Sequence, residues 1–303
     1  MNYKITCHLM PWELDFALLS FTQLKKSKYY LSDEDTIYID VTLNLSSYII
    51  NWDNSKMPID FFIDKFENLK SLLTNYNCKF SIFNKDYLYG VLNTMYESTE
   101  PHIDYYIVLN PDMYFSEHLL SLLITSSKTI ENKYFLISPE IRKLWDSTWD
   151  IICNDEYINL SYDLYTKIDP YDVRFNMKSN NKDVYLKKIN TFKFAGWFDL
   201  YNKSFWTTFM INKNWTGYGA CDLYASILAN FSKNRGVDIQ QYILKNQIVS
   251  EYNHGTMYNT KYTDHYKKYI SLKDIPNQRI EFEKNMEKYI KNWIDDAKYN
   301  KII

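Results

Sequence analysis

The sequence predicts an α/β fold in which helices flank a mostly parallel central sheet. Short apolar runs of strand length alternate with longer segments whose apolar residues recur every three or four positions. Strands separated by such helices pair in parallel, because each crossover returns the chain to the same edge of the sheet. The 303 residues are 46% hydrophobic and 24% charged, a balance that supports a packed core.

Five segments have the length and composition of strands. They are rich in Ile, Val, Tyr and Phe. The predicted strands cover residues 4–10, 36–41, 79–83, 105–109 and 134–138. Since proline cannot donate a hydrogen bond to a sheet, Pro11 is expected to end the first strand and Pro139 the fifth.

Three segments between these strands show the helical period. The predicted helices cover residues 12–26, 59–73 and 87–95. The first is expected to bury one stripe of its surface, formed by Leu14, Leu18, Phe21 and Leu24. The corresponding stripe of the second is formed by Phe62, Phe66, Leu69 and Leu73.

The second half of the chain is less regular. Residues 140–190 show no clear period and are interpreted as an insertion or a flexible lobe. Periodicity returns at residue 191 with a strand–turn–strand pattern, and a helix is expected to start at Asp222. A last strand is predicted over residues 247–252 and a long helix over residues 279–299.

This pattern predicts one domain over residues 1–270 and a C-terminal helical extension over residues 271–303. The extension is expected to pack on the core or on a partner chain. Its acidic residues oppose tight binding to anionic lipid, and peripheral contact with a membrane is the alternative.

The composition argues against several classes of protein. The net charge of −2 offers no basic surplus for nucleic acid. No run of 18 apolar residues could span a bilayer, and residues 1–20 do not resemble a signal peptide, so we expect a cytoplasmic protein. The four cysteines form no CxxC pair. The 29 Tyr, 17 Phe and 8 Trp reflect either an AT-rich genome or a surface that stacks on sugar-like ligands.

Polar residues end or follow three of the predicted strands. Asp40, Asn84 and Asp112 are expected at carboxyl ends, where ligands bind in parallel α/β sheets. In the stretch IVLNPDMYF, Pro111 forces the chain out of the sheet and holds Asp112 at its edge. A carboxylate there can bind a divalent cation, although Asn-Pro-Asp is also ordinary turn chemistry.

Two later segments carry further candidate groups. In NWTGYGACDLYASILANF, Asp222 begins the predicted helix after Trp215 and Tyr218. It is either a helix N-cap or a general base that faces an aromatic pocket. In EYNHGTMY, His254 follows an apolar strand and is either a hydrogen-bonded structural residue or a metal ligand.

Taken in order, these motifs resemble those of nucleotide-sugar glycosyltransferases with the Rossmann-like GT-A fold. The resemblance is greatest to family 2 and to its rhamnosyltransferase-like and galactosyltransferase-like members. IVLNPDMYF resembles the N-P-D form of the family's metal motif, and IYIDVTLNLSS, with Asp40, resembles its second strand. WTGYGACD resembles the acceptor-side motif except at Cys221, where the family has Glu. The motifs span about residues 3–255.

The resemblance implies a metal-dependent, inverting transfer of a sugar from a nucleotide-diphosphate donor to a hydroxyl of a glycan or glycolipid, as in polysaccharide biosynthesis. Asp112 and His254 would hold Mn²⁺ or Mg²⁺, and Asp222 would be the catalytic base. Residues 1–140 would form the nucleotide-binding half and residues 141–270 the acceptor-binding half. The implied nucleotide-binding residues are Pro11, Trp12, Asp40, Asn84, Asn93 and Asn110. The implied acceptor-binding residues are Gly196, Trp197, Trp215, Gly217 and Tyr218.

Two other functions stay open. A sugar nucleotidyltransferase would use a similar sheet, but MPWELDF lacks the Gly-rich basic loop that usually follows the first strand in those enzymes. A non-catalytic glycan-binding protein, or a degenerate member of the fold, is favoured by the many aromatic residues and by Cys221.

Overall fold

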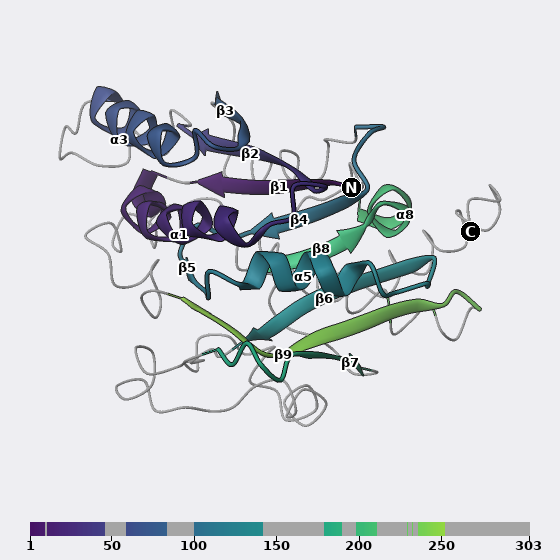
Figure 1. The fold of residues 1–303 in the computed structure, drawn as a ribbon. Helices are drawn as coiled ribbons and strands as arrows, with labels where there is room; N and C mark the ends of the chain where they lie inside the picture. The colour runs from purple at the N-terminus through teal and green to yellow at the C-terminus, as the bar shows by residue number, and fades with distance from the viewer. Residues whose placement is uncertain are drawn as a thin grey trace, which may run out of the picture.

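A nine-stranded mixed sheet forms the centre of the computed structural model, in the order β3-β2-β1-β4-β8-β6-β9-β5 with β7 also paired to β9 (Figure 1). The structure describes residues 1–9, 11–45, 59–83, 100–141, 179–189, 198–210, 229, 232 and 236–251. The strands are β1 Asn2–Leu9, β2 Thr36–Asn44, β3 Asn77–Phe83, β4 Tyr105–Leu109, β5 Met113–Tyr114, β6 Tyr134–Ile141, β7 Tyr185–Ile189, β8 Phe198–Asn202 and β9 Ile239–Glu251.

Helices connect several of these strands. The helical segments are η1 Pro11–Glu13, α1 Leu14–Ser27, η2 Lys28–Tyr30, α3 Ile59–Leu72, α5 Leu119–Ser127, α8 Lys203–Phe205 and η3 Trp206–Met210. Strands β1, β2, β3 and β4 pair in parallel, as do β6 and β9, whereas β8, β7 and β5 run against their neighbours. The predicted α/β class with a mostly parallel sheet is therefore confirmed.

The order of the first four strands creates a topological switch point. The chain proceeds outward from β1 to β2 and then to β3. It then returns to the other side of β1 to form β4. The connections that leave β1 and β4 therefore diverge at the carboxyl edge of the sheet, the place where ligands bind in open α/β sheets.

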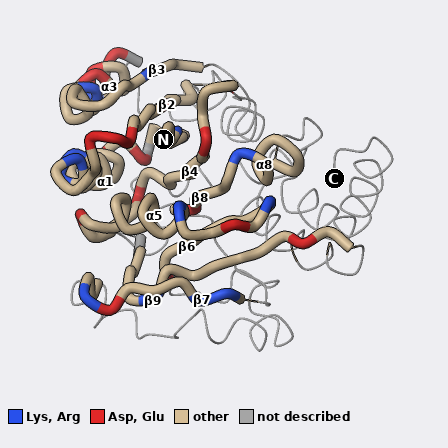
Figure 2. The backbone as a smooth tube through the Cα atoms, turned by 45° about the vertical axis from the view of Figure 1, so that its right-hand side comes forward, with Lys and Arg blue, Asp and Glu red and all other residues tan. Residues whose placement is uncertain are grey.

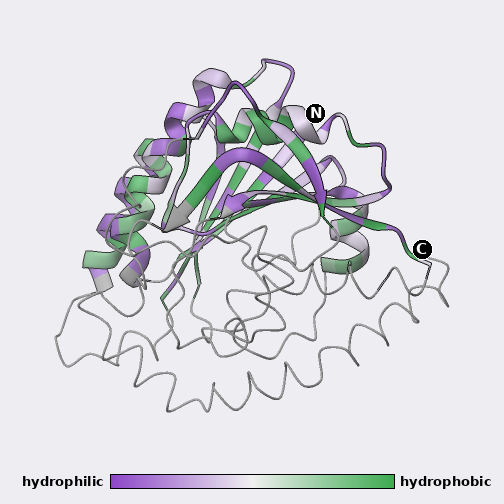
Figure 3. Cartoon of the chain, turned by 90° about the horizontal axis from the view of Figure 1, so that it is seen from below, coloured by the Kyte–Doolittle hydropathy of each residue, from purple (hydrophilic) through white to green (hydrophobic). Residues whose placement is uncertain are grey.

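The two faces of the sheet differ in chemistry. On β1, Tyr3, Ile5, Cys7 and Leu9 belong to one apolar core with buried residues of α1, α3 and α5, which lie on one side of the sheet (Figure 1). The alternate residues Lys4, Thr6 and His8 are buried but polar. Hydrophobic and hydrophilic residues therefore alternate along the strands (Figure 3). Parallel strands usually carry apolar residues on both faces, so this polar face is unusual.

The helices predicted over residues 12–26 and 59–73 are confirmed in outline. Phe62, Phe66 and Leu69 lie on α3, Leu73 directly follows it, and all four predicted residues are buried. In α1 the prediction for Leu18 is wrong, because this side chain is 44% exposed and Ala17 is buried instead. The stripe of α1 thus runs through Ala17, which lies three residues after Leu14 and four before Phe21.

The prediction that Pro139 ends its strand is also wrong. β6 continues to Ile141, and its register with β9 shifts between Pro139 and Glu140. Proline is tolerated within sheets at such bulges because no ladder hydrogen bond from its nitrogen is needed. Asn246 occupies the bulge on β9 with φ of 67°, and its backbone N–H donates to Glu140 Oε2 at 2.7 Å.

Part of the region interpreted as an insertion belongs to the sheet. β7 lies within residues 140–190 and pairs antiparallel with β9, with Tyr185 opposite Lys245 and Ile189 opposite Gln241. The last strand, predicted over residues 247–252, starts much earlier, at Ile239. The predicted helices over residues 87–95 and 279–299 lie outside the described residues.

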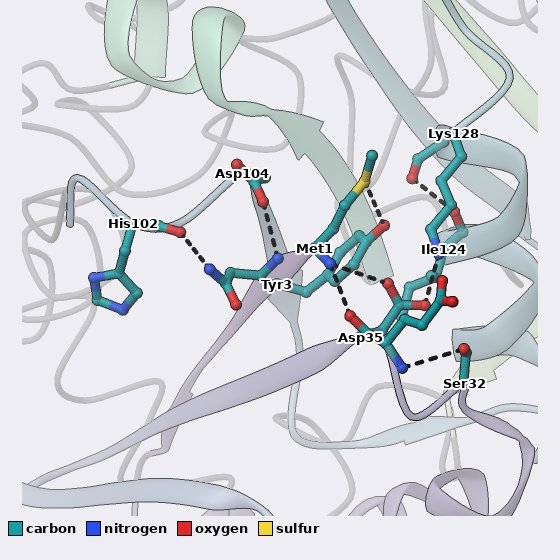
Figure 4. Close-up of polar contacts among 11 residues, drawn as sticks. Met1, Tyr3, Ser32, Asp35, His102, Asp104, Ile124 and Lys128 are labelled. Atoms are coloured by element: carbon teal, nitrogen blue, oxygen red, sulfur yellow. Dashed lines mark hydrogen bonds and ion pairs between the residues drawn. The ribbon is translucent and has the colours of Figure 1, made fainter.

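The amino ends of the strands are held together by polar contacts at the edge opposite the switch point. Asp35 precedes β2, and its carboxylate accepts a hydrogen bond at 2.8 Å from Lys128, which follows α5. Asn2 of β1 donates its backbone N–H to Asp104, just before β4, at 2.9 Å. Figure 4 shows Lys128 and Met1 approaching Asp35 from two directions.

Charges are mixed over the described surface. Acidic and basic residues both occur on α1 and on α3 (Figure 2). In the part of the chain that the structure describes, every helix is too short or too polar to cross a bilayer.

Candidate active site

The turn after β1 brings η1 to the carboxyl edge of the sheet. Leu9 ends the strand, and Pro11 and Trp12 begin η1. Pro11 is buried, and Glu13 is the N-cap residue of α1. Proline suits the start of a helix because its φ is already helical and its nitrogen needs no partner there.

The turn that links β4 to β5 lies at the same edge. Pro111 is buried, whereas Asn110 and Asp112 are half-buried. The Ser20 hydroxyl of α1 donates a hydrogen bond to the carbonyl oxygen of Met113 at 2.6 Å. This bond ties the residue after Asp112 to the middle of α1, the helix that follows β1.

Two carboxylates affect the buried thiol of Cys7 near the end of β1. Burial raises the pKa of the Cys7 thiol, and the negative charges of Glu13 and Asp112 raise it further. Both carboxylates therefore disfavour the charged form of this thiol. The resemblance implied that the turn over residues 10–13, which ends at Glu13, contacts the nucleoside, but it gave Glu13 no role of its own.

The end of β9 also reaches the turn that follows β4. β5 pairs antiparallel with the end of β9, so that Met113 faces Glu251 and Tyr114 faces Ser250. Met113 directly follows Asp112. The last described residue of β9 therefore lies beside the Asp112 turn.

The predicted position of Asp40 at the end of its strand is wrong. β2 continues to Asn44, so Asp40 lies within the strand, opposite Thr6 of β1. Its carboxylate is 2.7 Å from the Nζ of Lys4, which also lies 2.8 Å from Glu100. Burial lowers the pKa of Lys4, but hydrogen bonds to Asp40 and Glu100 outweigh this effect and raise it. The nucleotide-binding role of Asp40 stays a prediction.

The remaining predicted site residues lie outside the described part of the chain. They are Asn84, Asn93, Gly196, Trp197, Trp215, Gly217, Tyr218, Asp222 and His254. Among the described residues, no group of three or more His, Cys, Asp or Glu side chains is arranged to hold a metal ion.

The polar face also holds a buried carboxylate that the motifs did not indicate. Asp199 on β8 lies opposite Val108 of β4. It is the second residue of β8, at the edge of the sheet where β4 ends. It accepts hydrogen bonds from Ser138 at 2.6 Å and from Tyr201 at 3.2 Å. A buried carboxylate held by two hydroxyl groups keeps a fixed orientation.

Comparisons with known proteins give only distant similarities. No family model and no curated protein matches the sequence. S. aureus TarS 1-349 in complex with UDP-GlcNAc matches with a TM-score of 0.44 and 10% identity, over 86% of this chain and 61% of that one. The same protein in complex with UDP matches with a TM-score of 0.44 and 10% identity, over 82% of this chain and 60% of that one.

The inositol-1-phosphate CTP transferase from T. maritima matches with a TM-score of 0.42 and 10% identity, over 89% of this chain and 96% of that one. This chain thus spans about three fifths of the length of the two TarS structures. Similarity at this level assigns no function to the chain.

Proposed function

We propose that this chain is a metal-dependent, inverting glycosyltransferase that moves a sugar from a nucleoside-diphosphate donor to a hydroxyl of a glycan or glycolipid. The observation that carries the proposal is the pairing of Met113 with Glu251, directly after the turn that contains Asp112. Two further features support it, namely the strand order and the anchored Asp112 turn.

The switch point supports the binding of a nucleotide. In open α/β sheets, ligands bind beyond the carboxyl ends of strands where the chain direction reverses. The turns that contain Pro11 and Asn110 flank this point, since they follow the neighbouring parallel strands β1 and β4. Both residues were predicted from the motifs to contact the nucleotide.

The β5–β9 pairing supports a shared metal site. Asp112 precedes Met113 by one residue, and His254 follows Glu251 by three. Because Met113 and Glu251 are paired, the chain enters the segment that contains His254 from a point beside Asp112. A carboxylate and an imidazole are both ligands that Mn²⁺ accepts, and the carboxylate suits Mg²⁺.

The chemistry assigned to these residues is a single displacement. When bound, the metal ion neutralises the diphosphate of the donor and makes it a better leaving group. Asp112 and His254 hold the ion, and the turn over residues 10–13 and Asn110 bind the nucleoside. Asp222 takes the proton of the acceptor hydroxyl, whose oxygen forms the new bond to the anomeric carbon as the bond to the diphosphate breaks.

Nucleotide binding tests the proposal directly. UDP, GDP and dTDP would be screened by thermal shift with and without Mn²⁺, and the best ligand measured by calorimetry. We expect Asp112→Asn to lower the Mn²⁺-dependent affinity at least about tenfold, the loss typical of one strong charged contact. The matched control is Asp33→Asn, which removes the same charge from an exposed residue before β2. This variant should bind the nucleotide with the wild-type affinity in the presence of Mn²⁺.

Unchanged Mn²⁺-dependent binding in Asp112→Asn would refute the metal assignment. Sugar transfer from the matching nucleotide sugar would support the glycosyltransferase over the other two functions. Pyrophosphate release from a nucleoside triphosphate and a sugar phosphate would instead favour a nucleotidyltransferase.

A further inference from the structure

His8 lies on the polar face of the sheet, near the carboxyl end of β1. It is the last residue on that face of β1, and it pairs across the sheet with Thr42 of β2. On the other side, Thr6 pairs with Val108 of β4. The pairing of β1 with β4 ends at this pair, so His8 lies beyond it, at the end of β1 that borders the switch point.

The imidazole of His8 is buried and neutral. Its side chain is 4% exposed, and burial lowers its pKa to about 3. A neutral imidazole has one nitrogen that donates a hydrogen bond and one that accepts. The ring therefore suits an uncharged polar partner and is a poor counter-ion for a phosphate.

The Nε2 of His8 has no hydrogen-bond partner among the residues that the structure describes. Elsewhere on the same face, the Thr6 hydroxyl donates a hydrogen bond to the carbonyl oxygen of Ile107, and the Ser138 hydroxyl donates one to Asp199. An unpaired buried nitrogen loses the hydrogen bonds of water without replacement, so native proteins retain few of them. An apolar side chain at this position would avoid that loss of stability.

We infer that His8 binds the nucleoside part of the donor, with Nε2 exchanging a hydrogen bond with the base or with a ribose hydroxyl. The inference rests on the proposed function and adds a specificity residue to its site. The nucleoside is the matching chemistry because it offers neutral donors and acceptors, whereas the diphosphate offers negative charge. Because Nε2 is buried, the ligand reaches it only with a local rearrangement above the ring.

Two substitutions separate this role from a structural one. His8→Leu replaces the imidazole with an apolar side chain, whereas His8→Gln places an amide group near the position of Nε2. Binding of UDP, GDP and dTDP with Mn²⁺ would be measured by calorimetry, and the melting temperature of each variant without nucleotide by thermal denaturation.

We expect His8→Leu to melt at or above the wild-type temperature and to bind the preferred nucleotide about tenfold more weakly, equivalent to about 1.4 kcal/mol. His8→Gln should recover most of that affinity. Nucleotide should also shift the ¹⁵N signal of Nε2 in the labelled wild-type protein, and the spectrum of His8→Gln identifies that signal.

Equal nucleotide affinity in the wild type and His8→Leu would overturn the inference and leave the proposed function standing. A lower melting temperature in His8→Leu, with no recovery of binding in His8→Gln, would make the residue structural and also overturn it. If the wild type binds none of the three nucleotides, the proposed function fails and this inference fails with it.

Discussion

Replacing Lys4 with methionine tests how the polar face is stabilised. Lys4 is only 1% exposed, yet its ammonium group contacts two carboxylates. It lies 2.7 Å from Asp40 and 2.8 Å from Glu100. Methionine keeps most of the apolar stem, so the change removes the charge and both hydrogen bonds with little loss of packing.

The expected loss follows from the exposure of the three groups. Removing one member of a buried ion pair costs about 3–5 kcal/mol, because the remaining charge loses its partner. Asp40 and Glu100 are 25% and 41% exposed, so water partly replaces the ammonium group. We therefore expect Lys4→Met to lower the free energy of unfolding by about 3 kcal/mol at pH 7, near the lower end of that range.

The loss should depend on pH. The hydrogen bond from Lys4, followed by the charges of Lys4 and His102, lowers the pKa of Glu100 below its ordinary value of 4.5 against the opposing effect of burial. A carboxylate with a lowered folded-state pKa stabilises the protein above its unfolded pKa and loses this effect as the pH falls through the folded pKa. The difference between wild type and Lys4→Met should therefore be full at pH 6–7 and shrink below about 4.5.

Urea unfolding followed by circular dichroism measures these free energies. The matched control is Lys65→Met, which breaks an ion pair of 2.6 Å between Lys65 and Asp15 on the exposed faces of α3 and α1. That pair should contribute less than about 1 kcal/mol. If Lys4→Met is no less stable than Lys65→Met, or if its loss does not change with pH, the argument for a buried cation shared by two carboxylates is wrong.

Two further predictions concern a buried histidine and the core. Because the folded-state pKa of His8 is about 3 and its ordinary value is 6.5, the unfolded chain binds the extra proton first as the pH falls. From this residue alone, the free energy of unfolding of the wild type should thus fall by up to about 1.4 kcal/mol per pH unit below pH 6.5. Urea unfolding at pH 6.5, 5.5 and 4.5 measures this loss, which His8→Leu should lack. If the stabilities of the two proteins fall in parallel with pH, the prediction is wrong. In the same assay Phe66→Ala should lower the free energy of unfolding by about 3–5 kcal/mol, since the ring is fully buried and its centroid lies 5.4 Å from that of Phe80. The control Leu18→Ala, on the exposed side of α1, should lower it by less than about 1 kcal/mol.

Local periodicity predicted much of the framework. The strand over residues 105–109 coincides with β4, and the four residues expected to bury α3 are all buried. α5 was missed because LLSLLITSS is apolar around most of its circumference and shows no period. β7 was missed because its polar, half-exposed sequence is recognisable only from its pairing with β9.

The polar groups on the sheet show the limit of such reasoning. The aspartate in TIYIDV predicts that the strand ends there, because burying an isolated charge inside a sheet costs free energy. β2 nevertheless continues past Asp40, since Lys4 on the neighbouring strand neutralises it. The partner is 36 residues away in the chain, and no local pattern connects the two.

The sequence by itself determined the alternation of strands and helices and the carboxylate that follows β4, because both depend on neighbouring residues along the chain. Only the tertiary structure decided that β4 returns beside β1, that the charges of Glu13 and Asp112 act on the same thiol, and that the end of β9 pairs with the residue after Asp112. These contacts depend on the pairing of strands that are distant in sequence. The free energy of such pairing comes from burial and hydrogen bonding across the whole sheet, which no short stretch of sequence records.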